Sequence, residues 1–75
     1  MDNREIKNRI EYIVVCISEF AKRFNLTTQQ AYGYLHRFKG IDFLNEFYEV
    51  EHTQSIESAV DDLQMYCYNN GGRIA

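Results

Sequence analysis

The sequence is notable first for what is missing from it. It has no proline, the residue that interrupts helices most strongly, so long and unbroken helices are expected. No apolar run approaches the roughly 20 residues that a membrane span requires. The charged N-terminus, MDNREIKNR, has no apolar segment of the kind found in signal peptides. These absences argue against a membrane protein and predict a cytoplasmic location.

Cysteine is scarce as well. Cys16 and Cys67 are far apart in the chain and no C-x-x-C pair occurs, so neither a disulfide framework nor a zinc framework is indicated. Both cysteines fall on apolar stripes, which favours two inert, buried thiols.

The residues that are present follow helical periodicity. A capping-box pattern at Asp2 and Glu5 opens a first helix, which the spacing predicts from Asn3 to Phe24. Its apolar stripe consists of Ile6, Ile10, Ile13, Val14, Ile17, Ala21 and Phe24. A second start signal follows, with Thr27 as the cap and Gln30 three residues later. This second helix has the stripe Ala31, Tyr34, Leu35 and Phe38, and Gly40 is expected to stop it.

Two further helices are expected in the second half of the chain. The third opens at Ile41-Asp42 and ends between Val50 and His52, with the stripe Phe43, Leu44, Phe47 and Tyr48. The fourth is capped by Thr53 or Ser55 and broken by the Asn69-Asn70-Gly71-Gly72 segment, with the stripe Ile56, Ala59, Val60, Leu63 and Cys67. The sequence therefore predicts an all-α fold: one domain over residues 1–75, a small bundle of four helices. The first two helices are expected to pair in a helix-turn-helix-like arrangement.

Charge of one sign is missing from each half of the chain. Residues 20–41 contain no acidic residue but four basic ones, Lys22, Arg23, Arg37 and Lys39. Residues 42–68 contain no lysine or arginine and seven acids, Asp42, Glu46, Glu49, Glu51, Glu57, Asp61 and Asp62. Two interpretations are open. The halves attract each other within the fold, or they form a basic and an acidic face for different partners.

The stretch FYEVEHTQS, residues 47–55, concentrates polar side chains. A metal site needs three or four converging ligands, and this stretch supplies two at suitable spacing, Glu49 and His52. General acid–base chemistry needs a pocket and a nucleophile, and no such motif accompanies the histidine. We therefore expect no catalytic, metal or cofactor site and no enzymatic activity. Tyr48, His52 and Thr53 are expected to form a structural corner between two helices, with His52 hydrogen-bonded inside the fold.

Two surfaces are candidates for binding. The outer face of the fourth helix mixes carboxylates with large contact side chains, which suits a basic protein partner. With the end of the third helix, the predicted partner-binding residues are Glu49, Glu51, Glu57, Asp61, Met65 and Tyr68. The alternative is a dimeric DNA-binding regulator that reads bases with the second helix. Its predicted contact residues are Gln29, Gln30, Tyr32, His36, Arg37 and Lys39. Contacts with phosphates dominate the affinity for DNA. The second helix has few lysine and arginine residues to make such contacts, which disfavours this alternative.

The chain contains the short motifs Cys16-Ile17, Phe20-Ala21, Leu44, Tyr48, His52-Thr53 and Asp61-Asp62. In these motifs it resembles a bacterial family, the domain of unknown function numbered 3791. Members of that family are often encoded beside a larger ADP-ribosyltransferase-like protein, so the resemblance implies a small antitoxin-like companion. The leading prediction is a non-enzymatic protein–protein interaction module, with a homodimer left open.

Overall fold

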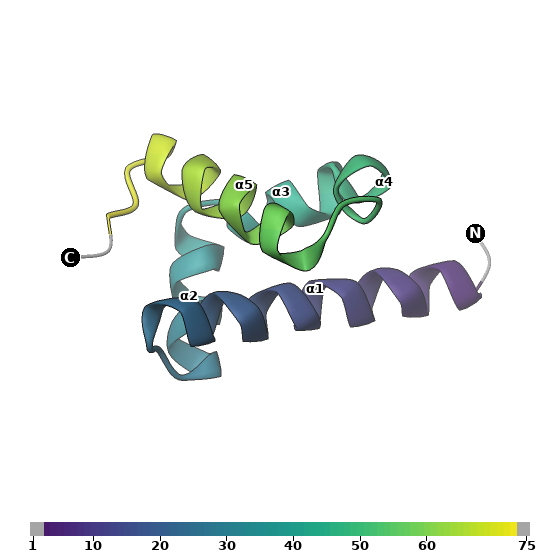
Figure 1. Ribbon diagram of the computed structural model, residues 1–75, viewed down its shortest axis with the longest axis horizontal. Helices are drawn as coiled ribbons and strands as arrows, with labels where there is room; N and C mark the ends of the chain where they lie inside the picture. Colours follow the sequence, from purple (N-terminus) through teal and green to yellow (C-terminus); the bar gives the residue numbers. More distant parts are fainter. Residues whose placement is uncertain (1–2, 74–75) are drawn as a thin grey trace.

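The computed structural model describes residues 3–73, and these residues form five helices (Figure 1). They are α1 (Asn3–Phe24), α2 (Thr28–Arg37), α3 (Gly40–Glu46), α4 (Tyr48–Glu51) and α5 (Ile56–Asn69). The described part of the chain contains no strand, so the all-α prediction is confirmed, whereas the prediction of four helices is wrong. The predicted capping box at the start of α1 involves Asp2, which lies outside the described residues.

Helix α1 has the predicted bounds and sets the length of the molecule. A 22-residue helix is about 33 Å long, and the described structure extends 40 Å along its longest axis but only 22 and 21 Å along the others. The helix ends because Asn25 takes a left-handed conformation with φ of 56°, which asparagine tolerates better than most residues. The Leu26 N–H then donates to the Ala21 carbonyl at 2.9 Å, which closes the last turn.

Helix α2 begins at the predicted capping box. Thr27 Oγ1 accepts from the Gln30 N–H at 3.1 Å, and the Gln30 side chain accepts from the Thr27 N–H at 2.9 Å. The predicted stop at Gly40 is wrong, because α2 ends at Arg37 and the left-handed residue is Lys39, with φ of 67°. Gly40 instead starts α3 and is buried. A Cβ at this position would lie 2.8 Å from the Cys67 Sγ, so the close packing here requires glycine.

The predicted third helix is divided in two at Phe47. In a continuous helix the Asn45 carbonyl would accept from the Glu49 N–H. Here it accepts from the Arg9 guanidinium at 2.9 Å. The break turns Tyr48 toward α1, where its ring meets that of Tyr12 edge-on at 5.5 Å. Phe47 is left exposed, so the prediction that it belongs to the buried stripe is wrong.

Helix α5 is capped by Ser55, whose hydroxyl accepts from the Ser58 N–H at 3.1 Å. It ends in a Schellman motif: the Gly72 N–H donates to the Cys67 carbonyl at 2.9 Å and the Gly71 N–H to the Tyr68 carbonyl at 3.1 Å. Gly71 supplies the positive φ, 94°, that this motif requires.

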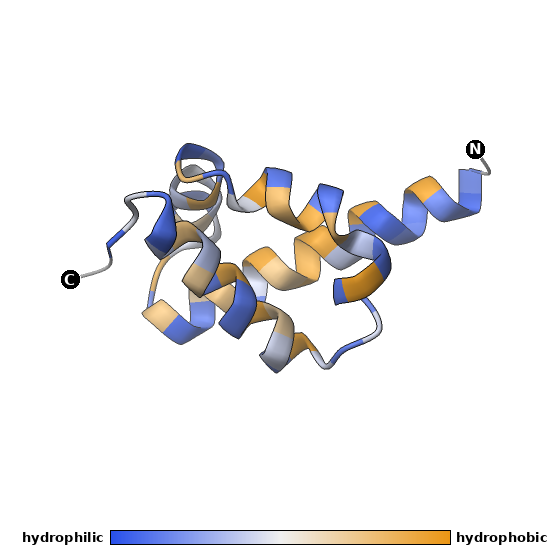
Figure 2. Cartoon of the chain, turned by 90° about the horizontal axis from the view of Figure 1, so that it is seen from above, coloured by the Kyte–Doolittle hydropathy of each residue, from blue (hydrophilic) through white to orange (hydrophobic). Residues whose placement is uncertain are grey.

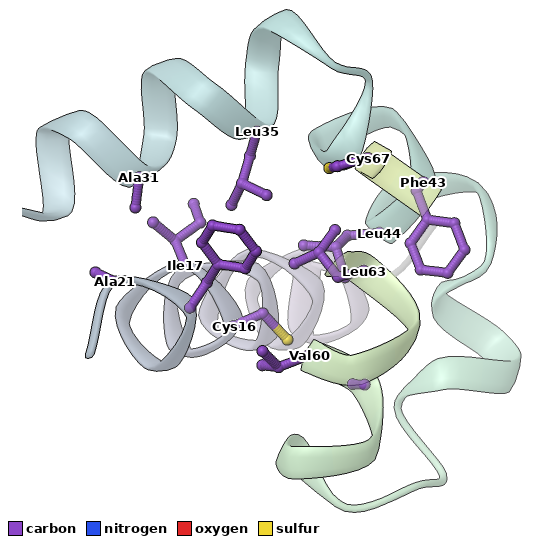
Figure 3. Close-up of a cluster of buried hydrophobic side chains, with 12 residues drawn as sticks. Cys16, Ile17, Ala21, Ala31, Leu35, Phe43, Leu44, Val60, Leu63 and Cys67 are labelled. Carbon is purple, nitrogen blue, oxygen red and sulfur yellow. The ribbon is translucent and has the colours of Figure 1, made fainter. Parts of the chain in front are cut away.

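The core lies where α1, α2, α3 and α5 meet (Figure 3). Its largest fully buried side chains are Phe20, Leu35, Leu44, Leu63, Val60, Cys16 and Cys67. Both cysteines are free and buried, as the sequence predicted. No helix within the described residues combines the length and apolar character needed to cross a membrane.

Candidate functional site

A groove of about 770 Å³ opens between the C-terminal end of α1, α2 and the second half of α5. Each of these elements supplies part of its wall, and the turn after α5 adds Gly72 and Arg73. The lining residues are Phe24, Tyr34, Asp61, Gln64, Met65, Tyr68, Gly72 and Arg73. A concave surface of this size with aromatic walls is typical of binding sites.

The wall on the α1 and α2 side is built from aromatic rings that support one another. Phe24 packs against the fully buried Phe20, with 4.7 Å between ring centroids, and Tyr34 stacks on Phe20 at 5.5 Å. Phe38 backs Tyr34 at 4.9 Å. These contacts fix the rings in place, so the wall is formed before any ligand arrives.

The turn after α5 fits tightly against this wall. A Cβ on Gly72 would lie 2.6 Å from the Tyr34 hydroxyl and 2.8 Å from the Phe38 ring, so only glycine allows the approach. Burial, together with the nearby Cys67 thiol, raises the pKa of the Tyr34 hydroxyl.

The α5 side of the groove carries its most exposed apolar side chains. Met65 is 66% exposed and Tyr68 is 58% exposed. The Arg73 guanidinium lies over the Tyr68 ring at 5.9 Å. Asp61 stands at the rim and accepts from the Arg23 guanidinium at 2.5 Å. The groove therefore offers two large apolar contacts beside a carboxylate.

The predicted partner-binding residues do not all gather in one place. Asp61, Met65 and Tyr68 line the groove. Glu57 is exposed one turn before Asp61 on α5, and its carbonyl accepts from Arg23. Glu49 lies on α4, away from the groove, where its carboxylate is 3.9 Å from the Arg9 guanidinium.

Glu51 does not meet the expectation of a surface acid, because it is only 6% exposed. Its carboxyl faces Asp62 on α5. Burial, the negative charge of Asp62 and a hydrogen bond between the two carboxyl groups raise the pKa of Glu51 to about 7. Such a bond requires one of the two groups to hold a proton. Glu51 is thus a protonatable group inside the fold, and it does not line the groove.

Two core side chains lie beside Glu51. Burial raises the pKa of the Tyr12 hydroxyl and of the Cys16 thiol, and the charge of Glu51 adds to both effects. Burial likewise raises the pKa of the Cys67 thiol to about 11. Neither cysteine therefore has the exposure and the thiolate character of a nucleophile.

The corner formed by Tyr48, His52 and Thr53 holds α4 together. His52 Nδ1 is 2.7 Å from the Tyr48 carbonyl oxygen, and the two rings stack at 4.5 Å. The Thr53 hydroxyl donates to the Val50 carbonyl at 2.7 Å. The Arg9 guanidinium covers the Tyr48 ring at 4.7 Å. Ser55 rather than Thr53 caps the following helix.

The residues of the DNA-binding alternative are all exposed on or just after α2. Gln30 is engaged in the capping box, Tyr32 and His36 stack on each other at 5.9 Å, and the Arg37 guanidinium lies over the Phe38 ring at 5.4 Å. Two of the four basic residues in the segment 20–41 form ion pairs within the fold. Arg23 pairs with Asp61 of the acidic half, and Lys22 pairs with Glu19 of its own helix.

Most of the groove is not predictable from the sequence. Phe24 and Tyr34 fall on predicted buried stripes, Gly72 is predicted to break a helix, and no sequence pattern points to Gln64 or Arg73. These residues come together only once α2 and α5 are positioned. The one available signal was the glycine pair after α5, which allows the chain to turn back.

These features define a small all-α domain with a preformed aromatic groove. Comparison with protein families then places it: the chain belongs to the family described as "Protein of unknown function (DUF3791)", whose model matches residues 11–70. The resemblance seen in the short sequence motifs is thereby confirmed. Neither the curated proteins nor the solved structures gave a match.

Proposed function

We propose that the protein is a non-enzymatic interaction module whose groove binds a protein partner. The observation that carries this proposal is the exposure of Met65 and Tyr68 over a preformed aromatic wall. Full burial of a large apolar side chain contributes about 1.5–3 kcal/mol. Methionine and tyrosine are also enriched in protein interfaces.

The charge around the groove favours a basic partner segment. The outer side of α5 exposes Glu57, Asp61 and Asp62 and carries no base. Arg23 neutralises Asp61 in part, at a surface where such pairs contribute little. A partner that places an apolar side chain against Met65 and a lysine or arginine beside the acids would satisfy both features.

The family resemblance suggests which partner to test first. Because the resemblance implies a companion of a larger ADP-ribosyltransferase-like protein, we propose that this chain is an antitoxin-like partner of such a protein. The test is co-expression with the product of the adjacent gene, followed by co-purification and assay of that product. Co-purification with a change in its activity is expected. Failure to co-purify together with unchanged activity would overturn the assignment.

A non-catalytic role is part of the same proposal. It is supported by the positions of the groups that chemistry would need: His52 is held by the Tyr48 carbonyl, and Cys16 and Cys67 are buried. Two free thiols also fit a reducing compartment, which supports the cytoplasm as the place of action. Turnover that is abolished by His52→Ala without a lower melting temperature would contradict this assignment.

The alternative function is DNA binding by a dimer through a helix-turn-helix-like pair of α1 and α2. It is favoured by the tight turn at Asn25 and by an α2 face without acids. It is disfavoured by the overall charge of −3. It predicts a salt-dependent gel shift that Arg37→Ala and Gln29→Ala weaken, and a protein that binds no DNA even at low salt eliminates it.

A further inference from the structure

A second uncovered apolar surface lies on the N-terminal half of α1. Ile6, Ile10 and Val14 follow one another at one-turn intervals and are 41%, 56% and 56% exposed. They continue the stripe of Ile17 and Ala21, which is buried. Figure 1 shows the reason: α2 lies against the C-terminal half of α1, and the N-terminal half runs on past it. Figure 2 shows apolar positions between the polar ones on this projecting part.

One edge of this stripe is charged, and its two charges have opposite signs. Lys7 and Glu11 both have strongly exposed side chains, and they pair only loosely, at 4.0 Å. On a helix they lie beside Ile10 and Val14, on the side turned away from the core. An exposed pair of this kind contributes only a few tenths of a kcal/mol within the helix, so both residues are available to a partner.

We propose that the N-terminal half of α1 is a homodimer interface, in which it packs antiparallel against the same segment of a second copy. A two-fold axis at Ile10 would place Ile10 opposite its counterpart and Ile6 opposite Val14 of the other copy. Such an interface is isologous, so every contact occurs twice.

The charged edge selects this arrangement. In an antiparallel two-fold pair the same edge of each stripe meets itself in reverse order. Lys7 of each copy therefore lies near Glu11 of the other, displaced by two residues, or about 3 Å along the axis. A lysine side chain spans that displacement. A parallel two-fold pair would place this edge against the opposite edge of the other stripe, and the charges would not meet.

The interface is small, so the dimer is weak. Helix α2 begins to cover α1 near Ile17, which limits the overlap to about 15 residues, or about 22 Å of helix. Specific interfaces below about 1,200 Å² of total buried area belong to transient complexes. Dissociation in the micromolar range or above is expected.

Sedimentation equilibrium from micromolar to millimolar concentration tests the proposal, with circular dichroism as a check of folding. The mass of the wild type should rise from 8.9 kDa toward twice that value. Val14→Lys should raise the dissociation constant at least about tenfold. The matched control is Val15→Lys on the same helix, 43% exposed and turned by about 100° from Val14, which should associate like the wild type.

A charge exchange tests the register without touching the apolar stripe. Lys7→Glu alone should weaken association, and so should Glu11→Lys alone, because each places like charges opposite each other. An equimolar mixture of the two variants should associate more strongly than either one, since every pair across the heterodimer is then of opposite sign. A wild type that stays monomeric throughout, equal effects of Val14→Lys and Val15→Lys, or a mixture no stronger than its components would each overturn the proposal.

Discussion

The buried Glu51 should make the fold less stable as the pH rises through neutrality. Its pKa in the folded protein is about 7, above the ordinary value of 4.5. A carboxyl whose pKa is raised by folding leaves stability intact below pH 4.5. Stability is then lost as the pH rises from about 4.5 to about 7, because over this range the unfolded chain ionises the carboxyl while the folded state, which solvates the carboxylate poorly, keeps it protonated. Glu51→Gln keeps the shape and removes the ionisation.

The magnitude follows from the same pKa values. A tenfold change in proton affinity corresponds to about 1.4 kcal/mol, so the full effect would reach about 3 kcal/mol. Solvent reaches the partner carboxyl, Asp62, which is exposed, and screens part of it. We therefore expect Glu51→Gln to be about 1–2 kcal/mol more stable than the wild type at pH 8.5, which is about 4–16 °C in melting temperature for a domain of this size.

The assay is urea or thermal unfolding of both proteins at pH 4.5 and pH 8.5. The difference in unfolding free energy between the two proteins should disappear at the lower pH. Because both proteins contain the same other titrating groups, the effects of those groups cancel in this difference. The control is Glu49→Gln, an exposed carboxyl two residues away, which should show no such pH-dependent gain. If Glu51→Gln is no more stable than the wild type at pH 8.5, or gains equally at both pH values, the description of Glu51 as a buried, destabilising carboxyl is wrong.

Further predictions concern packing, capping and thiol exposure. Gly33→Ala should stabilise the protein by about 0.5–1 kcal/mol because a Cβ there meets open space within a helix. Gly40→Ala should destabilise it by about 1–3 kcal/mol because its Cβ would overlap the Cys67 Sγ. In urea titrations the unfolding midpoint should therefore rise for Gly33→Ala and fall for Gly40→Ala. Thr27→Ala should lower the unfolding free energy by about 1 kcal/mol, measured in the same way, through loss of the α2 cap. Cys16 and Cys67 should react with a thiol reagent only after denaturant is added, and rapid labelling of the native protein would show that the core is not closed.

The parts of the fold that the sequence predicted correctly depend on neighbours along the chain. The α2 cap is formed by Thr27 and Gln30, three residues apart. The stripe of α5 recurs every three or four residues, and Cys67 falls on it as expected. Such signals are visible in the sequence because the interacting groups lie within one turn of each other.

The features that the sequence did not predict depend on contacts between distant segments. The break at Phe47 accompanies the bond from Arg9 to the Asn45 carbonyl, between residues 36 positions apart. The raised pKa of Glu51 depends on its burial and on Asp62, which α5 brings against it. In the candidate site, helical spacing brought Asp61, Met65 and Tyr68 together, but the opposite wall required the placement of α1 and α2.

The proposed role of the groove can be tested by isothermal titration of the co-purifying partner against three proteins: the wild type, Met65→Lys and Val50→Lys. Val50 is a matched control because it is about as exposed as Met65 but lies on α4, outside the groove. Loss of an interface anchor typically costs 2 kcal/mol or more, so Met65→Lys should bind at least about 30-fold more weakly. Val50→Lys should bind like the wild type. Equal affinity of Met65→Lys and the wild type would show that the partner does not bind in the groove.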